Sequence, residues 1–157
     1  MNKEDLQRMK FLVLDFDGVL TDNLVIIDQD GKESVTCSRE DGMGIELLKG
    51  TGIEIMVISR ERNPVVKRRC EKLGIECIHG VESKLELFRK EVEKRGKSMT
   101  ETCYVGNDVN DNECIEAAGI GIAVNDAHYR TKAVADHVTE RKGVKGGVRE
   151  IIVLMLP

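Results

Sequence analysis

Short apolar runs alternate along the chain with segments whose apolar residues have helical spacing. Residues 11–14 read Phe-Leu-Val-Leu and lead directly into Asp15, Phe16, Asp17 and Gly18. An apolar run followed by acidic residues and a glycine is typical of a buried strand with acidic side chains in the loop at its carboxyl end. Further strands are predicted at 53–58, 75–78, 102–105 and 120–124, and helices at 41–49, 64–73, 83–95, 112–118 and from about 147. The alternation predicts an α/β fold, with a Rossmann-like parallel sheet and helices on both faces.

A small hairpin is predicted directly after the first strand. Two short segments, 24–27 and 33–36, flank the turn Asp28-Gln-Asp-Gly31. Aspartate and glycine favour tight turns, so these segments should pair as antiparallel strands. No internal repeat, linker or low-complexity stretch interrupts the pattern, and we expect residues 1–157 to form a single domain.

Composition narrows the class of protein. Charged residues make up 33% of the chain and hydrophobic residues 41%, which argues against extended disorder. A net charge of −4 gives no general attraction to nucleic acid or acidic membranes. The five cysteines form no CxxC pair and fit no closed disulfide framework, so reduced thiols are expected. Residues 1–10 are polar and charged and no apolar stretch is long enough to span a bilayer, so we expect a cytoplasmic protein.

Four polar features follow predicted strands or begin predicted helices. They are Asp15 with Asp17, Ser59, Lys84, and the segment Gly106-Asn-Asp-Val-Asn-Asp111. Parallel strands bring such features to one edge of a sheet, where open α/β folds bind ligands. Two carboxylates could hold a divalent cation such as Mg²⁺ while one remains free to attack phosphorus. The combination favours phosphoryl transfer.

Each of these residues also has a simpler interpretation when it is taken alone. Ser59 could be a strand-end or helix-capping residue, and Lys84 a solvated helix lysine. Asp108 and Asp111 could cap the helix that follows them.

In order and approximate spacing, the four features resemble the motifs of the haloacid dehalogenase superfamily of phosphohydrolases. The resemblance includes Asp15-Phe-Asp-Gly-Val-Leu-Thr-Asp22 and covers essentially the whole chain. It implies that Asp15 forms an aspartyl-phosphate and that Asp17 acts as the general acid and base, provided that the chain bends after Asp15. It also implies that Ser59 hydrogen-bonds a phosphoryl oxygen and that Lys84 neutralises charge on Asp15 and the phosphate.

The same resemblance implies a Mg²⁺ cofactor, held by Asp15, the backbone carbonyl of Asp17 and a side chain of the fourth motif. The family pattern Gly-Asp-x-x-x-Asp has an asparagine here, Asn107, with Asp108 next. An amide oxygen can bind Mg²⁺ but lacks charge and should bind it more weakly. Either Asn107 is a neutral ligand, or Asp108 substitutes for it, or catalysis is poor.

Finer features resemble a capless subfamily. Neither 21–59 nor 59–84 has room for a cap domain, and segments 38–45 and 143–150 resemble phosphatases of 2-keto-3-deoxy sugar acids. That group acts on 3-deoxy-D-manno-octulosonate 8-phosphate or on 2-keto-3-deoxynononate 9-phosphate, and includes a domain fused to some CMP-sialic acid synthetases. Glu61, Arg69 and Lys72 match the substrate-binding residues of the nine-carbon group, although both basic residues could equally lie on a solvated helix face. The resemblance further implies a homotetramer, with the hairpin as a contact.

Two hypotheses follow from this resemblance. The favoured one is a Mg²⁺-dependent phosphatase of a phosphorylated sugar acid, the nine-carbon or sialic acid 9-phosphate type first and the eight-carbon type next. The alternative is a weakly active or non-catalytic oligomerisation module associated with a CMP-sialic acid synthetase, which Asn107 keeps open. A broad sugar-phosphate phosphatase is a further enzymatic option, because an open site discriminates small substrates poorly.

Overall fold

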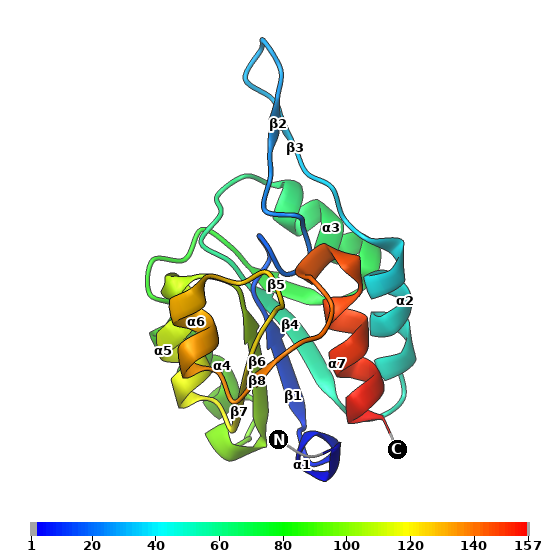
Figure 1. Cartoon of the computed structure of the whole chain (residues 1–157), viewed down its shortest axis with the longest axis vertical. Helices are drawn as coiled ribbons and strands as arrows, with labels where there is room; N and C mark the ends of the chain where they lie inside the picture. Colours follow the sequence, from blue (N-terminus) through cyan, green and yellow to red (C-terminus); the bar gives the residue numbers. More distant parts are fainter. Residues whose placement is uncertain (1–2, 157) are drawn as a thin grey trace.

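The computed structural model describes residues 3–156, built around a six-stranded parallel sheet in the order β5-β4-β1-β6-β7-β8 (Figure 1). The strands are β1 (Phe11–Leu14), β4 (Glu54–Ile58), β5 (Glu76–Ile78), β6 (Thr102–Gly106), β7 (Ile120–Ala123) and β8 (His137–Val138). After β1, the strands β4 and β5 are added on one side of it, and β6, β7 and β8 are then added on its other side. The direction of strand order therefore switches between β1 and β6. Ligands bind at such a switch point in open α/β sheets. The predicted fold class is confirmed.

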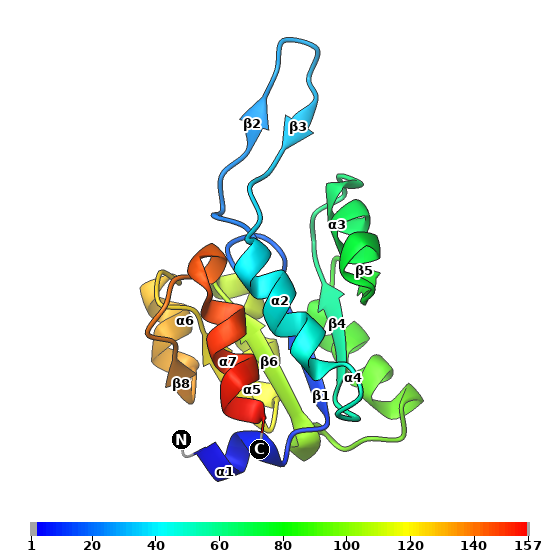
Figure 2. The same cartoon turned by 90° about the vertical axis from the view of Figure 1, so that its right-hand side faces the viewer.

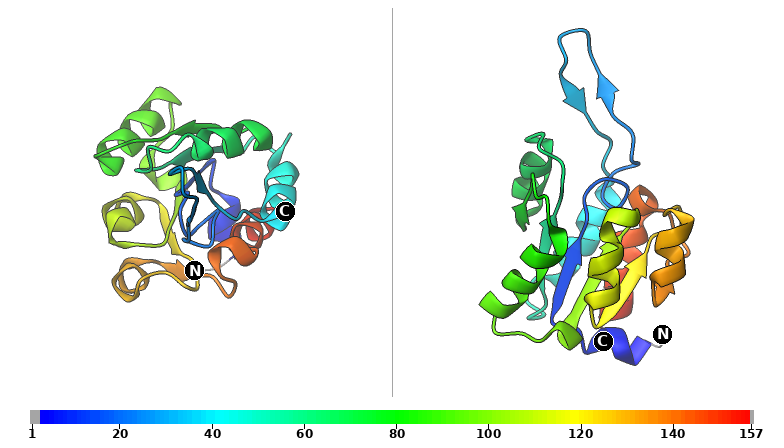
Figure 3. Two further views of the ribbon diagram at one scale, coloured as in Figure 1. Left: turned by 90° about the horizontal axis from the view of Figure 1, so that it is seen from above. Right: turned by 90° about the vertical axis from the view of Figure 1, so that its left-hand side faces the viewer.

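Apolar side chains cover both faces of the sheet, as is usual for a parallel sheet. All four residues of β1 are buried, and Leu12 lies in register with Ile55 of β4 and Cys103 of β6. Leu12 and Leu14 pack into the larger core, whereas Phe11 and Val13 pack into the core on the other face. Figures 2 and 3 show the helices arranged around the sheet in these two layers.

The helices agree with the predicted segments in most cases. They are α1 (Lys3–Gln7), α2 (Arg39–Leu48), α3 (Val65–Leu73), α4 (Lys84–Lys94), α5 (Asn112–Ala117), α6 (Tyr129–Val134) and α7 (Gly147–Met155). Helices α2, α3 and α7 cover the larger core, and α4 and α5 cover the other. Three elements were not predicted: α1, α6 and β8. They are too short for a hydrophobic period to reveal them.

The predicted hairpin is present but shorter than expected. Strands β2 (Ile26–Ile27) and β3 (Glu33–Ser34) pair antiparallel over two residues each. The hairpin projects beyond the carboxyl ends of the sheet strands, and α1 lies at the opposite end of the molecule (Figure 2). Leu24 and Ile26 are 69% and 66% exposed, so this projection presents an apolar surface.

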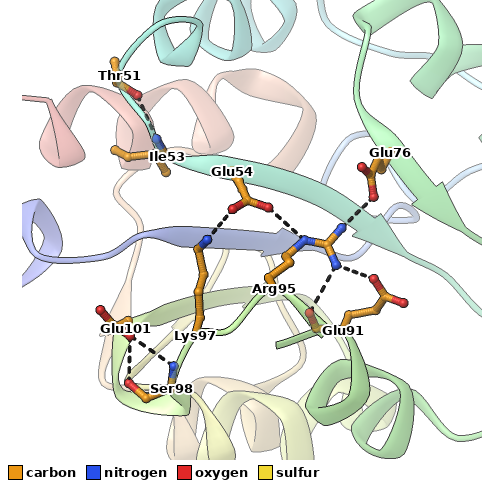
Figure 4. A network of polar contacts seen from close by, with 9 residues as sticks. All are labelled: Thr51, Ile53, Glu54, Glu76, Glu91, Arg95, Lys97, Ser98 and Glu101. Carbon is orange, nitrogen blue, oxygen red and sulfur yellow. Dashed lines mark hydrogen bonds and ion pairs between the residues drawn. The ribbon is translucent and has the colours of Figure 1, made fainter. Parts of the chain in front are cut away.

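A network of ion pairs fixes the amino-terminal ends of the strands, away from the switch point (Figure 4). Arg95, at the end of α4, lies 3.0 Å from the Glu54 carboxylate through Nε and 2.5 Å from the Glu76 carboxylate through Nη2. Its guanidinium also forms an ion pair with Glu91. The guanidinium carbon lies over the Phe11 ring, 4.7 Å from the ring centroid. This network ties α4 to the starts of β4 and β5.

The five cysteines are free thiols, as expected. Between residues 3 and 156, none of the helices has the length and apolar character needed to cross a membrane.

Candidate active site

The chain leaves β1 in a tight turn that carries the first two candidate residues. Asp15 still donates its backbone N–H to Val105 of β6 at 2.9 Å, and the carbonyl of Phe16 then accepts the N–H of Leu20. Gly18 has a φ of +80°, a left-handed conformation that favours glycine. The bend after Asp15 on which the proposed roles of Asp15 and Asp17 depend is therefore present, and both residues line the same cleft.

Lys84, the first residue of α4, reaches the buried carboxylate of Asp15. Its ammonium lies 2.7 Å from Asp15 Oδ1 and 2.7 Å from Asp111 Oδ1, and all three side chains are nearly inaccessible to solvent. Burial and the Asp111 carboxylate raise the pKa of Asp15 to about 7, against the opposing effect of Lys84. Burial alone would lower the pKa of Lys84, but the two carboxylates raise it. Lys84 is therefore a permanent cation beside the candidate nucleophile.

Asp111 was not among the candidate site residues, yet it joins the lysine to the fourth motif. Besides Lys84, Asp111 accepts the Tyr104 hydroxyl at 3.0 Å and the Asn107 N–H at 3.0 Å. It also closes a capping box with Asp108 at the turn Val109–Asp111. Capping was the simpler interpretation of Asp111, and the structure shows that it both caps the turn and holds Lys84. The sequence signal that could have identified Asp111 is its position, which matches the final aspartate of the family pattern Gly-Asp-x-x-x-Asp.

Ser59 follows β4 and faces the same cleft. Its side chain is buried, and its Oγ accepts the Glu61 N–H at 3.1 Å, which leaves the hydroxyl proton available for an external acceptor. The Glu61 side chain lines the cleft as well. Burial, followed by the nearby Glu61 carboxylate, raises the pKa of Asp17. A raised pKa suits a carboxyl group that must give up a proton to a leaving group.

The predicted metal ligands converge, although they do not form an all-acidic cage. Asp15, Asp17, Asn107 and Asp108 all line one cleft of about 110 Å³. Among residues 3–156 there is no group of three or more His, Cys, Asp or Glu side chains placed to hold a metal. The available donors are instead carboxylate, amide and backbone carbonyl oxygens, the ligand chemistry that suits Mg²⁺.

The structure gives Asn107 and Asp108 different surroundings. Asn107 is buried, 8% exposed, and packs against Gly18. Asp108 is less buried, and its Oδ1 accepts the Val109 N–H at 2.7 Å as the cap of the following turn. Both side chains line the cleft, so either Asn107 or Asp108 as a metal ligand stays a prediction.

Arg69 and Lys72 lie apart from these residues. Both line a groove of about 650 Å³ between α2 and α3, and the Arg69 Nη2 donates to the carbonyl of Ser38 at 2.7 Å. Within the described residues, the cleft beside Asp15 contains Glu61 but neither of the two basic residues. Their predicted role in binding a substrate carboxylate stays a prediction.

The cleft combines a buried carboxylate, a fixed cation, a free hydroxyl proton and a second carboxyl with a raised pKa. These groups can attack an electrophile, neutralise an anion and deliver a proton. They come from the ends of β1 and β4 and from the start of α4, and Asp111, which holds the cation, follows β6.

Comparisons with known proteins agree with this chemistry. A family model described as haloacid dehalogenase-like hydrolase matches residues 66–152. The 3-deoxy-D-manno-octulosonate 8-phosphate phosphatase of Escherichia coli K12 is 35% identical over 151 residues, 96% of this chain and 80% of that protein.

Solved structures show the same similarity. The 3-deoxy-D-manno-octulosonate 8-phosphate phosphatase of Moraxella catarrhalis, in complex with magnesium, phosphate and KDO, superposes with a TM-score of 0.94 and 32% identity, covering 98% of this chain and 89% of that one. The cobalt-bound Haemophilus influenzae phosphatase gives a TM-score of 0.92 and 33% identity, covering 97% and 90%. The predicted enzyme class, a phosphoric monoester hydrolase, is confirmed. The chain belongs to the haloacid dehalogenase-like hydrolases.

Proposed function

We propose that this protein hydrolyses the phosphate monoester of a 2-keto-3-deoxy sugar acid through a covalent intermediate on Asp15. The observation that carries the proposal is the Lys84 ammonium, 2.7 Å from both Asp15 and Asp111 at the carboxyl edge of the sheet. A structural ion pair has no need to face a cleft that also contains Ser59 and Asp17. Relatives named as phosphatases of such a sugar acid support the substrate class.

The residues of the cleft divide the reaction into two steps. Asp15 attacks phosphorus through a carboxylate oxygen while the bond to the sugar oxygen breaks, and Asp17 gives its proton to that oxygen. Asp17 then takes a proton from water, whose oxygen attacks the phosphorus and releases phosphate from Asp15. Lys84 neutralises the charge on Asp15 and the phosphoryl group, and Ser59 donates its free hydroxyl proton to a phosphoryl oxygen.

Mg²⁺ is the proposed cofactor, held by Asp15, the Asp17 carbonyl and Asn107. When bound, it supplies positive charge that keeps Asp15 ionised and offsets the repulsion between its carboxylate and the phosphoryl group. Relatives crystallised with magnesium and with cobalt support a divalent cation.

Two sugar lengths remain in the proposal. Glu61, Arg69 and Lys72 resemble the substrate-binding residues of the nine-carbon group, and Glu61 lines the cleft, which favours the nine-carbon acid 9-phosphate. The names of the relatives favour the eight-carbon acid 8-phosphate instead. Comparing kcat/KM for the two substrates tests which one the enzyme prefers.

Assembly as a homotetramer in the cytoplasm completes the proposal. Four consecutive exposed apolar residues support a contact through the hairpin, since such a patch is costly to leave in water: Leu24, Val25, Ile26 and Ile27. Sedimentation velocity of the wild type and of Ile26→Asp tests this contact. We expect the variant to sediment as a smaller species.

A non-catalytic oligomerisation module is the competing proposal, and the neutral Asn107 is the observation that favours it. A substrate panel separates the two. The panel contains the two sugar acid phosphates and p-nitrophenyl phosphate, each with Mg²⁺ and with a chelator. We expect Mg²⁺-dependent phosphate release that is fastest with a sugar acid. No release from any substrate would favour the module.

A further inference from the structure

Asn63, in the loop between β4 and α3, makes hydrogen bonds in three directions. Its backbone N–H donates to Glu61 Oε1 at 2.6 Å, and its side-chain Oδ1 accepts the N–H of Val65 at 3.0 Å. Its Nδ2 donates to Glu33 Oε2 of the hairpin strand β3 at 3.3 Å. One residue therefore connects the cleft, the start of α3 and the hairpin.

Within one chain, the pairing of the hairpin strands with each other is weak. Strands β2 and β3 pair over only two residues each, and two-stranded hairpins are marginally stable in water. Across residues 3–156, the Asn63–Glu33 contact is the one side-chain hydrogen bond that joins positions 25–36 to the rest of the chain, and no ion pair does so. In Figure 2 the hairpin rises beside the loop that precedes α3.

Of the two carboxylates that Asn63 contacts, Glu61 lines the cleft and Glu33 belongs to the hairpin. Glu61 lines the cleft together with Asn23 at the base of the hairpin, and Glu33 Oε2 lies 3.3 Å from Asn63 Nδ2. Carboxylates accept hydrogen bonds from hydroxyl groups and repel phosphate. Glu61 therefore suits the polyhydroxyl part of a sugar and not its phosphoryl group.

We propose that Asn63 is a positioning residue that fixes the Glu61 side chain and latches the hairpin to the mouth of the cleft through Glu33. The latch would set the affinity for the sugar portion of the substrate and leave phosphoryl transfer unchanged. This inference rests on the proposed function only for the identity of the sugar, because the latch itself exists without substrate.

Hydrogen exchange on the substrate-free protein tests the latch directly when it is measured in the Ile26→Asp background, which removes the proposed subunit contact of the hairpin. Asn63→Ser keeps an oxygen that can accept the Val65 N–H but is too short to reach Glu33. We expect backbone amides of the hairpin, measured on the millisecond timescale, to exchange roughly fivefold faster in this variant, the effect of one lost hydrogen bond. Amides of the first turn of α3 should be unchanged. Equal hairpin exchange in both proteins, or a hairpin unprotected already in the wild type, would overturn the latch.

Exchanging the amide and the carboxylate between positions 63 and 33 tests whether the latch affects the affinity for the sugar portion of the substrate. Asn63→Asp keeps the side-chain volume and an oxygen that accepts the Val65 N–H, but it places a carboxylate against Glu33. Adding Glu33→Gln restores the hydrogen bond, with residue 33 now the donor and residue 63 the acceptor. We expect Asn63→Asp to raise KM for 3-deoxy-D-manno-octulosonate 8-phosphate roughly tenfold. Its kcat and its turnover of p-nitrophenyl phosphate should stay within about twofold, and the double variant should recover the wild-type KM.

These experiments distinguish a wrong role for Asn63 from a wrong substrate. Equal losses on both substrates, or no recovery in the double variant, would contradict the positioning role. A wild type that hydrolyses p-nitrophenyl phosphate but not the sugar acid would contradict the proposed substrate, and hydrogen exchange would still decide whether the latch exists.

Discussion

Asn107 packs directly against the backbone of Gly18, so closely that a Cβ on Gly18 would lie 1.9 Å from the Asn107 side-chain nitrogen. This contact joins the loop after β1 to the loop after β6, the two halves of the proposed cation site. The glycine of the first motif thus makes room for the residue at which the fourth motif departs from its family. Any side chain at position 18 must displace Asn107.

The first prediction uses this contact. Gly18→Ala should weaken Mg²⁺ binding at least about tenfold without changing any ligand, because a shift of the amide oxygen by even a fraction of an ångström spoils octahedral coordination. Isothermal titration calorimetry with Mg²⁺ measures the affinity.

Gly31→Ala is the matched control for Gly18→Ala. Gly31 has a similar φ of +77°, but a Cβ added there would have no neighbour within 4 Å, so this variant carries the backbone strain alone, about 1 kcal/mol. We expect its Mg²⁺ affinity to equal that of the wild type. The same loss of affinity in both variants would contradict a role for the Asn107 contact.

The second prediction concerns the charge at position 107. Asn107→Asp should bind Mg²⁺ more tightly than the wild type, since ligand charge is a main determinant of divalent-ion affinity. Asp108→Asn should change affinity little, because asparagine can also cap the turn at Val109. Metal titrations of both variants check this. Unchanged affinity in the first and a large loss in the second would make Asp108 the ligand.

The third prediction concerns the groove between α2 and α3. Arg69→Ala should raise KM for a phosphorylated sugar acid and hardly affect p-nitrophenyl phosphate, which has no carboxylate. Arg68→Ala, at an exposed neighbouring position of α3, is the control. Because Arg69 also holds the Ser38 carbonyl, thermal unfolding of both variants should accompany the kinetics. Equal kinetic losses on both substrates would assign Arg69 a structural role.

The fourth prediction is a pH dependence of stability that comes from Asp41. This buried side chain accepts the Arg149 N–H through Oδ1, and its Oδ2 has no partner within the described residues. Burial raises the pKa of Asp41 to about 6 from an ordinary 3.8. The folded state therefore binds the proton more tightly, and the free energy of unfolding should fall as pH rises from about 4 to about 6.

Asp41→Asn lacks this titration and isolates its effect. Its free energy of unfolding should exceed that of the wild type by about 1–2 kcal/mol at pH 8, with a smaller difference at pH 4. Urea denaturation at both pH values measures it, with Asp30→Asn on the exposed hairpin turn as the control. Parallel pH curves for Asp41→Asn and the wild type would contradict this account.

The parallel sheet and the main site residues were predictable because each has a local signal. The apolar run before Asp15 and the runs before Ser59 and Asn107 mark strand ends, and parallel topology brings those ends together. The bonds of Lys84 were predictable only through the resemblance, since a lysine at the start of a helix is normally solvated. Its partner Asp111 carried a local capping signal that hid its longer-range contact.

Other features depend on tertiary packing that no local pattern encodes. The groove containing Arg69 forms where α2 meets α3, and the helical period of α3 does not show which face meets its neighbour. Helix α6 is only six residues long and begins at the His128 cap. The Asn63–Glu33 contact joins residues 30 positions apart and depends on how the hairpin leaves the body.

The central claim is that Asp15 is phosphorylated during turnover. Acid quenching within milliseconds of mixing enzyme, Mg²⁺ and a ³²P-labelled sugar acid phosphate, followed by peptide mapping, tests it most directly. We expect label on the peptide that contains Asp15, and neither label nor turnover in a folded Asp15→Asn variant, whose amide is nearly isosteric but a poor nucleophile. Substantial phosphatase activity in Asp15→Asn would contradict the account.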